Sequence, residues 1–130
     1  MSRLALGAWA ALVAAASLVP LPPGPGQAFL FPGSDKVAHA LAYAVLCALI
    51  VWSTAGVRRG GRLLASAGAA GLFGLLMELL QPLTGRTCDM KDWAADVLGV
   101  VAAILAIALV ARVLRGAKAR TDAAGQQHAR

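Results

Sequence analysis

Four long apolar runs constrain this chain more than any other feature of its sequence. They cover residues 4–21, 37–55, 63–80 and 93–111, and each is close to the roughly 20 apolar residues that a membrane-spanning helix needs. Only 14% of the residues are charged, against about 25% in a typical soluble domain. The chain lacks the polar surface of a water-soluble protein. We therefore predict an all-α fold, a four-helix transmembrane bundle whose outer faces are covered by lipid.

Composition and charge argue against two other classes of protein. Aromatic residues make up only 5% of the chain, which disfavours an outer-membrane β-barrel with its aromatic girdles. The formal net charge is +6, but most of the cations flank the apolar runs, as membrane orientation requires. We therefore expect membrane lipids as partners and no nucleic acid. The spacing of Cys47 and Cys88 fits neither a disulfide framework nor a metal finger.

The distribution of Lys and Arg predicts the orientation in the membrane. With a cytoplasmic N-terminus, nine of the 12 cations lie on the inner side: Arg3, Arg58, Arg59, Arg62, Arg112, Arg115, Lys118, Arg120 and Arg130. Lys36, Arg86 and Lys91 then lie on the outer side. Because cytoplasmic loops carry the excess of positive charge, both termini are predicted to be cytoplasmic. The first run also resembles a cleavable secretory signal, an alternative that leaves the other three runs oriented in the same way.

The segments outside the runs suggest how the chain is organised. Residues 20–34 contain five of the six prolines and are predicted to form an extended loop. Residues 56–62 are predicted to form a tight basic turn. We expect a transmembrane domain at 1–112 and a basic, disordered cytoplasmic tail at 113–130 that is attracted to anionic lipid headgroups.

Polar residues gather where the predicted helices meet the extracytoplasmic side. They are Asp35, Lys36, His39, Tyr43, Glu78, Gln81, Arg86, Asp89, Asp92 and Asp96. Asp35, His39 and Tyr43 are spaced by four, which places them on one helix face. The aspartates of the last run are spaced by three and four, again along one face. We predict that three helices converge on a polar pocket at the extracytoplasmic end.

For three of these residues, exposure to lipid has the largest free-energy cost. A lone ionised side chain in the bilayer core costs about 2.5–3.5 kcal/mol, so His39, Glu78 and Asp96 are expected to face one another. They have the ligand types for a divalent metal and the groups for acid–base chemistry. The chain has no HExxH motif, nucleophile motif or phosphate-binding glycine loop. We therefore expect no cofactor and leave metal binding open.

A purely structural interpretation applies to several of the others. Asp35, Arg86 and Asp92 can equally be interfacial ion pairs and charges that stabilise helix starts. Small residues at four-residue spacing predict tight helix packing. These pairs are Ala67 with Gly71, Ala70 with Gly74, and Gly99 with Ala103.

Three segments together resemble the VanZ-like family, which is named for a teicoplanin-resistance protein. They are DKVAHALAY at 35–43, ELLQP at 78–82 and GRTCDMKDWAADVLG at 85–99. The family pattern falls on Asp35, Lys36, His39, Glu78, Gln81, Arg86, Asp89, Asp92, Asp96 and Gly99, and the resemblance covers about residues 4–112. Many members carry Asn where this chain has Asp96, so this chain adds a possible negative charge.

The resemblance implies a small multi-pass protein of the bacterial inner membrane whose biochemical activity is unsettled. Our leading interpretation is that the pocket binds an envelope glycan, a lipid-linked molecule or a glycopeptide. A membrane-embedded hydrolase or transferase that uses His39 and Glu78 is a second interpretation. A small dimeric proton-coupled exporter is a third, which is disfavoured because Glu78 lies near the end of its apolar run. The oligomeric state is left open.

Overall fold

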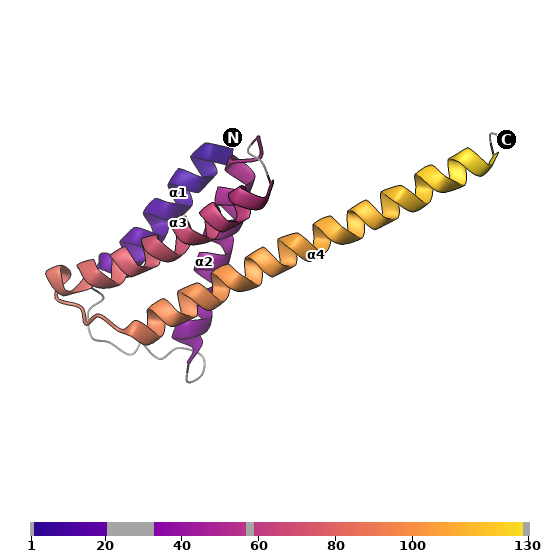
Figure 1. The fold of residues 1–130 in the computed structure, drawn as a ribbon. Coiled ribbons are helices and arrows are strands. Elements are labelled where there is room, and N and C mark those ends of the chain that lie inside the picture. The colour runs from indigo at the N-terminus through magenta and orange to yellow at the C-terminus, as the bar shows by residue number, and fades with distance from the viewer. Residues whose placement is uncertain (1, 21–32, 57–58, 129–130) are drawn as a thin grey trace.

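A computed structural model describes residues 2–20, 33–56 and 59–128 of the 130. The chain forms α1 (Ser2–Leu18), α2 (Ser34–Ser53), α3 (Arg59–Leu80), the short 3-10 helix η2 (Gln81–Thr84) and α4 (Met90–His128). The prediction of an all-helical fold with four long helices is confirmed, and no strand occurs within these ranges (Figure 1). The predicted loop at 20–34 lies mostly outside the described residues, as does Arg58 in the predicted basic turn.

Three of the helices are long and apolar enough to cross a membrane. These spans are Ser34–Ser53, Gly61–Thr84 and Met90–Asp122. Helix α1 is also apolar but shorter, since it ends at Leu18, whereas the sequence predicted a run to residue 21. Large apolar side chains such as Leu64 and Leu72 are exposed along the helices, as expected where lipid rather than protein covers a surface. The chain therefore has the make-up of a multi-pass membrane protein.

Residues with special backbone or capping properties define the helix ends at one end of the bundle. Gly33 has a left-handed backbone with φ of 85°, and its carbonyl accepts the first backbone hydrogen bonds of α2. Pro82 has no N–H to donate, so α3 gives way to η2, which ends at the left-handed Gly85. The Asp89 carboxylate accepts a 2.8 Å hydrogen bond from the Lys91 N–H and thereby caps α4.

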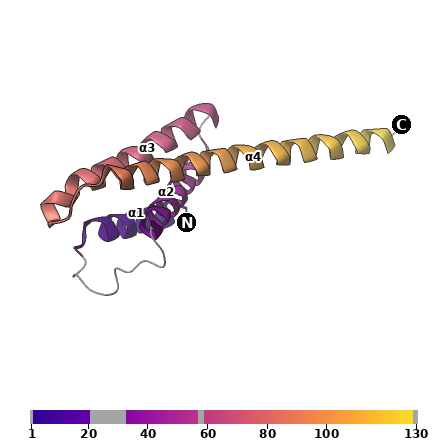
Figure 2. The same ribbon diagram turned by 90° about the horizontal axis from the view of Figure 1, so that it is seen from below.

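Helix α2 is the centre of the bundle. It packs against α1, α3 and α4, whereas the described residues of α1 make no contact with α4 (Figures 1 and 2). The buried core contains residues from all four long helices: Val13, Tyr43, Leu46, Cys47, Ala70 and Val100. On the α1 side, the Trp9 indole donates a 3.0 Å hydrogen bond to the Ala42 carbonyl and fixes α1 against α2.

Helices α2 and α4 cross at close range at Gly99. A Cβ atom at this position would lie 1.9 Å from the Ala40 carbonyl oxygen. Gly74 on α3 is in a similar position, because a Cβ there would lie 2.8 Å from Asp96 Oδ2. The predicted packing role of Gly99 and Gly74 is confirmed. Gly71 has no atom within 4 Å of its Cβ position, and its contact with α4 is made by its carbonyl, which accepts a 3.1 Å hydrogen bond from the Trp93 indole.

The C-terminal part of α4 differs from what the sequence predicted. The sequence suggested a disordered tail at 113–130, but α4 continues to His128 and projects well beyond the other helices (Figures 1 and 2). Ala, Arg, Lys and Gln are abundant in this segment and are good helix formers. The segment therefore needs no packing partner to favour a helix.

Candidate functional site

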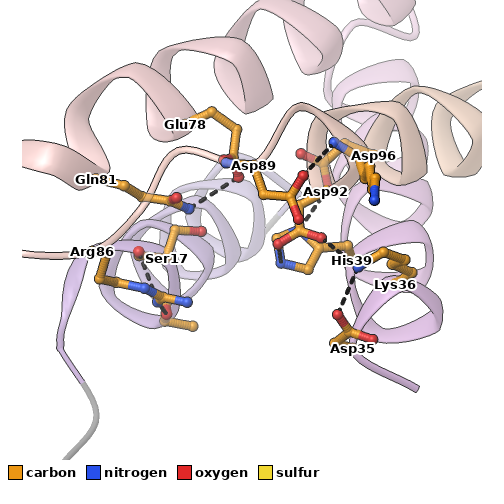
Figure 3. Close-up of polar contacts among 12 residues, drawn as sticks. Ser17, Asp35, Lys36, His39, Glu78, Gln81, Arg86, Asp89, Asp92 and Asp96 are labelled. Atoms are coloured by element: carbon orange, nitrogen blue, oxygen red, sulfur yellow. Dashed lines mark hydrogen bonds and ion pairs between the residues drawn. The ribbon is translucent and has the colours of Figure 1, made fainter. Parts of the chain in front are cut away.

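The polar residues singled out in the sequence lie at one end of the bundle, where α2 begins, α3 ends and α4 begins. Figure 3 shows nine of them: Asp35, Lys36, His39, Glu78, Gln81, Arg86, Asp89, Asp92 and Asp96. Tyr43 lies one helical turn further along α2 than His39 and is buried. The other nine residues divide into a central cluster, a partly exposed rim and a set that holds the helix ends together.

His39, Glu78 and Asp96 form the central cluster. Each comes from a different helix, and one donor atom from each side chain lies within 4.8 Å of the other two. His39 Nδ1 lies 2.9 Å from Asp96 Oδ1, within hydrogen-bond distance. Glu78 and Asp96 are each only 1% exposed, and His39 is partly exposed. The structure thus brings together the three side chains that the sequence expected to face one another.

Asp35, Lys36 and Asp92 form a partly exposed rim. The Lys36 ammonium donates hydrogen bonds to Asp35 Oδ2 at 2.8 Å and to Asp92 Oδ1 at 3.0 Å. Asp92 also connects the rim to the cluster, since its Oδ2 lies 3.8 Å from His39 Nε2. The side chains of Lys36 and Asp35 are 38% and 34% exposed. The Asp92 side chain is less accessible, at 19%. Ion pairs that solvent can reach add little stability, so a molecule arriving from solution can exchange partners with Lys36 and Asp35.

Glu78 also joins the end of α3 to the start of α4. Its Oε1 accepts a 2.9 Å hydrogen bond from Gln81 Nε2, and its Oε2 accepts one of 2.9 Å from the Asp89 backbone N–H. Gln81 is buried beside it. The Asp89 carboxylate caps α4 instead of facing the cluster, which supports the structural interpretation for this residue. Gln81 and the Asp89 backbone therefore position Glu78.

Arg86 is not part of the cluster, although the sequence placed it in the pocket. Its Nη1 donates 2.9 Å hydrogen bonds to the carbonyls of Ala16 and Ser17, near the C-terminus of α1 (Figure 3). The last carbonyls of a helix have no partner within the helix. Arg86 satisfies two of them and ties the loop before α4 to α1.

Sequence reasoning missed the contribution of Ser17 and Gly74. Ser17 is buried near the C-terminus of α1, and no pattern in the sequence connects it to the polar segments. Gly74 was identified only as a small packing residue, whereas both Tyr43 and Asp96 pack directly on it. The absence of a side chain at Gly74 provides the space in which the Asp96 carboxylate lies.

Comparison of the chain with protein-family models, with curated proteins and with solved structures gave no match in any of the three. Two buried carboxylates and an imidazole can hold a cation or exchange a proton with a bound molecule. The rim adds an ammonium group and two carboxylates, which can donate and accept hydrogen bonds at the surface.

Proposed function

We propose that the chain is a small VanZ-like protein of the bacterial inner membrane that binds a polar envelope molecule at its extracytoplasmic end. The ligand would be an envelope glycan, a lipid-linked molecule or a glycopeptide. The observation that carries this proposal is the arrangement of a partly exposed rim over a buried carboxylate–histidine cluster, formed by three helices at one end of the bundle. Functional binding sites combine accessible polar groups with rigid support in this way.

The chemistry of the rim favours a ligand rich in hydroxyl, amide or phosphate groups. The Lys36 ammonium donates hydrogen bonds, the carboxylates of Asp35 and Asp92 accept them, and His39 lies just behind. The buried Asp96 carboxylate holds the imidazole by its Nδ1 atom. A ligand would therefore meet preorganised groups, which reduces the entropy lost on binding.

The charge distribution supports an N-in, C-in orientation. Arg59 and Arg62 lie in the first turn of α3, at the end of the bundle opposite the cluster. Because the cytoplasmic side carries the excess of Lys and Arg, the cluster faces outward.

The native Cys88 provides a test of this orientation. It is exposed in the loop before α4, whereas Cys47 is buried. A membrane-impermeant thiol reagent should label Cys88 in intact cells. In a Cys88→Ser background, a cysteine introduced by Gly61→Cys near the basic turn should be labelled only after the cells are permeabilised. The opposite labelling pattern would place the cluster in the cytoplasm.

Alanine substitutions in the cluster and rim test the binding function. Each hydrogen bond to a charged group contributes about 1.5–3 kcal/mol, so Lys36→Ala and His39→Ala should weaken ligand binding about 10- to 100-fold. In a deletion strain with an envelope or glycopeptide-susceptibility phenotype, neither variant should restore the wild-type behaviour. As controls, Lys118→Ala and His128→Ala remove a lysine and a histidine side chain far along α4. These two variants should restore the wild-type behaviour fully. Full rescue by both Lys36→Ala and His39→Ala would show that the function does not need the rim or the cluster.

A further inference from the structure

The cluster of His39, Glu78 and Asp96 has the donor atoms and the spacing of a metal site. It offers one imidazole nitrogen and two carboxylate oxygens within 4.8 Å of one another. Bonds of about 2.0–2.2 Å to a shared ion bring ligand atoms to separations of about 3–4 Å. The 2.9 Å between His39 Nδ1 and Asp96 Oδ1 is already a separation that two ligands of one ion can have. Glu78 would need to approach by a small side-chain movement.

No Lys or Arg side chain among the described residues pairs with the Glu78 or Asp96 carboxylate of the cluster. Lys36 is paired with Asp35 and Asp92, and Arg86 is bonded to α1 carbonyls. Among the described residues, His39 is the only ionisable donor that pairs with Asp96, and Glu78 has no ion pair. Burying two carboxylates that share one imidazole is costly in a membrane protein. A divalent ion bound between them would offset that cost.

The buried hydroxyl of Tyr43, next to the cluster, is consistent with a ligand there. The Tyr43 hydroxyl is buried with the Ser17 side chain as its polar neighbour, but it forms no hydrogen bond of good geometry within the part of the chain that the structure describes. Tyr43 lies one turn from His39 on α2, and its ring packs on Gly74 beside Asp96. A Cβ atom added to Gly74 would lie 3.1 Å from Tyr43 Cε1 and 2.8 Å from Asp96 Oδ2. Buried hydroxyl groups are normally hydrogen-bonded. A water or hydroxide carried by a bound ion would supply the missing partner.

The surroundings of Glu78 also suit a metal ligand. Its carboxylate is held by Gln81 Nε2 and by the Asp89 backbone N–H, each at 2.9 Å. Ligating carboxylates in metal sites are oriented by such outer hydrogen bonds. We propose that His39, Glu78 and Asp96 bind one divalent transition-metal ion of the Zn²⁺ or Mn²⁺ class, for which mixed nitrogen and oxygen ligands are suited. This inference goes beyond the proposed envelope ligand and does not depend on it.

The test is metal binding by the purified full-length protein in detergent. After treatment with a chelator, the protein is dialysed against free Zn²⁺ or Mn²⁺, and the bound metal is measured by elemental analysis. We expect about one ion per chain, and at least about tenfold weaker binding by Asp96→Asn and by His39→Ala. Asp122→Asn and His128→Ala remove a carboxylate and an imidazole elsewhere on the chain and should bind like the unmodified protein. X-ray absorption of the Zn²⁺ form should show nitrogen and oxygen ligands without sulfur.

Several results would overturn the metal site. Binding of neither ion by folded protein would do so, as would undiminished binding by both cluster variants. Sulfur ligands would instead assign the ion to Cys47 or Cys88. Using two cluster variants guards against the chance that one of them fails to fold. Because the probe is a free ion, these results are independent of whether Lys36→Ala impairs the envelope phenotype.

Discussion

Replacing Gly99 by alanine is expected to disrupt the bundle more than the same change at any other described glycine. The new Cβ would lie 1.9 Å from the Ala40 carbonyl oxygen and 2.6 Å from the carbonyl carbon. These are backbone atoms, which cannot move aside as a flexible side chain can, so α2 and α4 would have to separate. Overpacking usually costs about 1–3 kcal/mol and occasionally more. We expect a loss of about 3 kcal/mol for Gly99→Ala, measured as a lower thermal unfolding midpoint in detergent.

Gly68→Ala is the matched control for this change. Gly68 is an exposed residue inside α3 and has no atom within 4 Å of its Cβ position. Both substitutions gain up to about 1 kcal/mol of helix propensity, so the difference between them isolates the contact with Ala40. An unfolding midpoint for Gly99→Ala equal to that of Gly68→Ala would contradict the close crossing of α2 and α4. The crossing also affects the site, because His39 on α2 and Asp96 on α4 lie next to it and contact each other.

The helices could be predicted from the sequence because lipid imposes a simple requirement on apolar runs. The runs at 37–55 and 63–80 fall within a few residues of α2 and α3. The exact ends depend on local contacts, such as the Asp89 cap that starts α4 before the apolar run begins. The low hydrophobicity of residues 113–130 predicts disorder, whereas α4 continues to His128. Helix propensity alone favours a helix in that segment.

The centre of the site could also be predicted, whereas its supports could not. His39, Glu78 and Asp96 had to face one another because the alternative was exposure to lipid. Helical spacing does not determine where a loop side chain points. Arg86 therefore appeared to belong to the pocket, although it bonds to the end of α1, which is 69 and 70 residues away in the chain. The role of Gly74 could not be read from the sequence either, since it depends on how α3 meets α4.

Glu78→Ala is expected to have the second large effect on stability. The substitution removes the acceptors of two hydrogen bonds, one from Gln81 Nε2 and one from the Asp89 N–H. Each buried donor left without a partner costs about 1–3 kcal/mol. We expect the free energy of unfolding to fall by about 2–5 kcal/mol, measured in detergent by thermal or denaturant unfolding. Leu79→Ala, on an exposed neighbour in the same helix, should have a much smaller effect.

Glu78→Gln separates the structural role of this side chain from its role in binding. Glutamine keeps one acceptor oxygen but replaces the other with a donor, so one of the two hydrogen bonds is retained and the other is lost. The glutamine variant also removes a buried negative charge, which offsets part of the loss. It should therefore be more stable than Glu78→Ala while still lacking the charge that a cation would need. If Glu78→Ala unfolds at the same temperature as the unmodified protein, Glu78 does not hold α3 to α4, and its burial would have to be explained by a bound ligand alone.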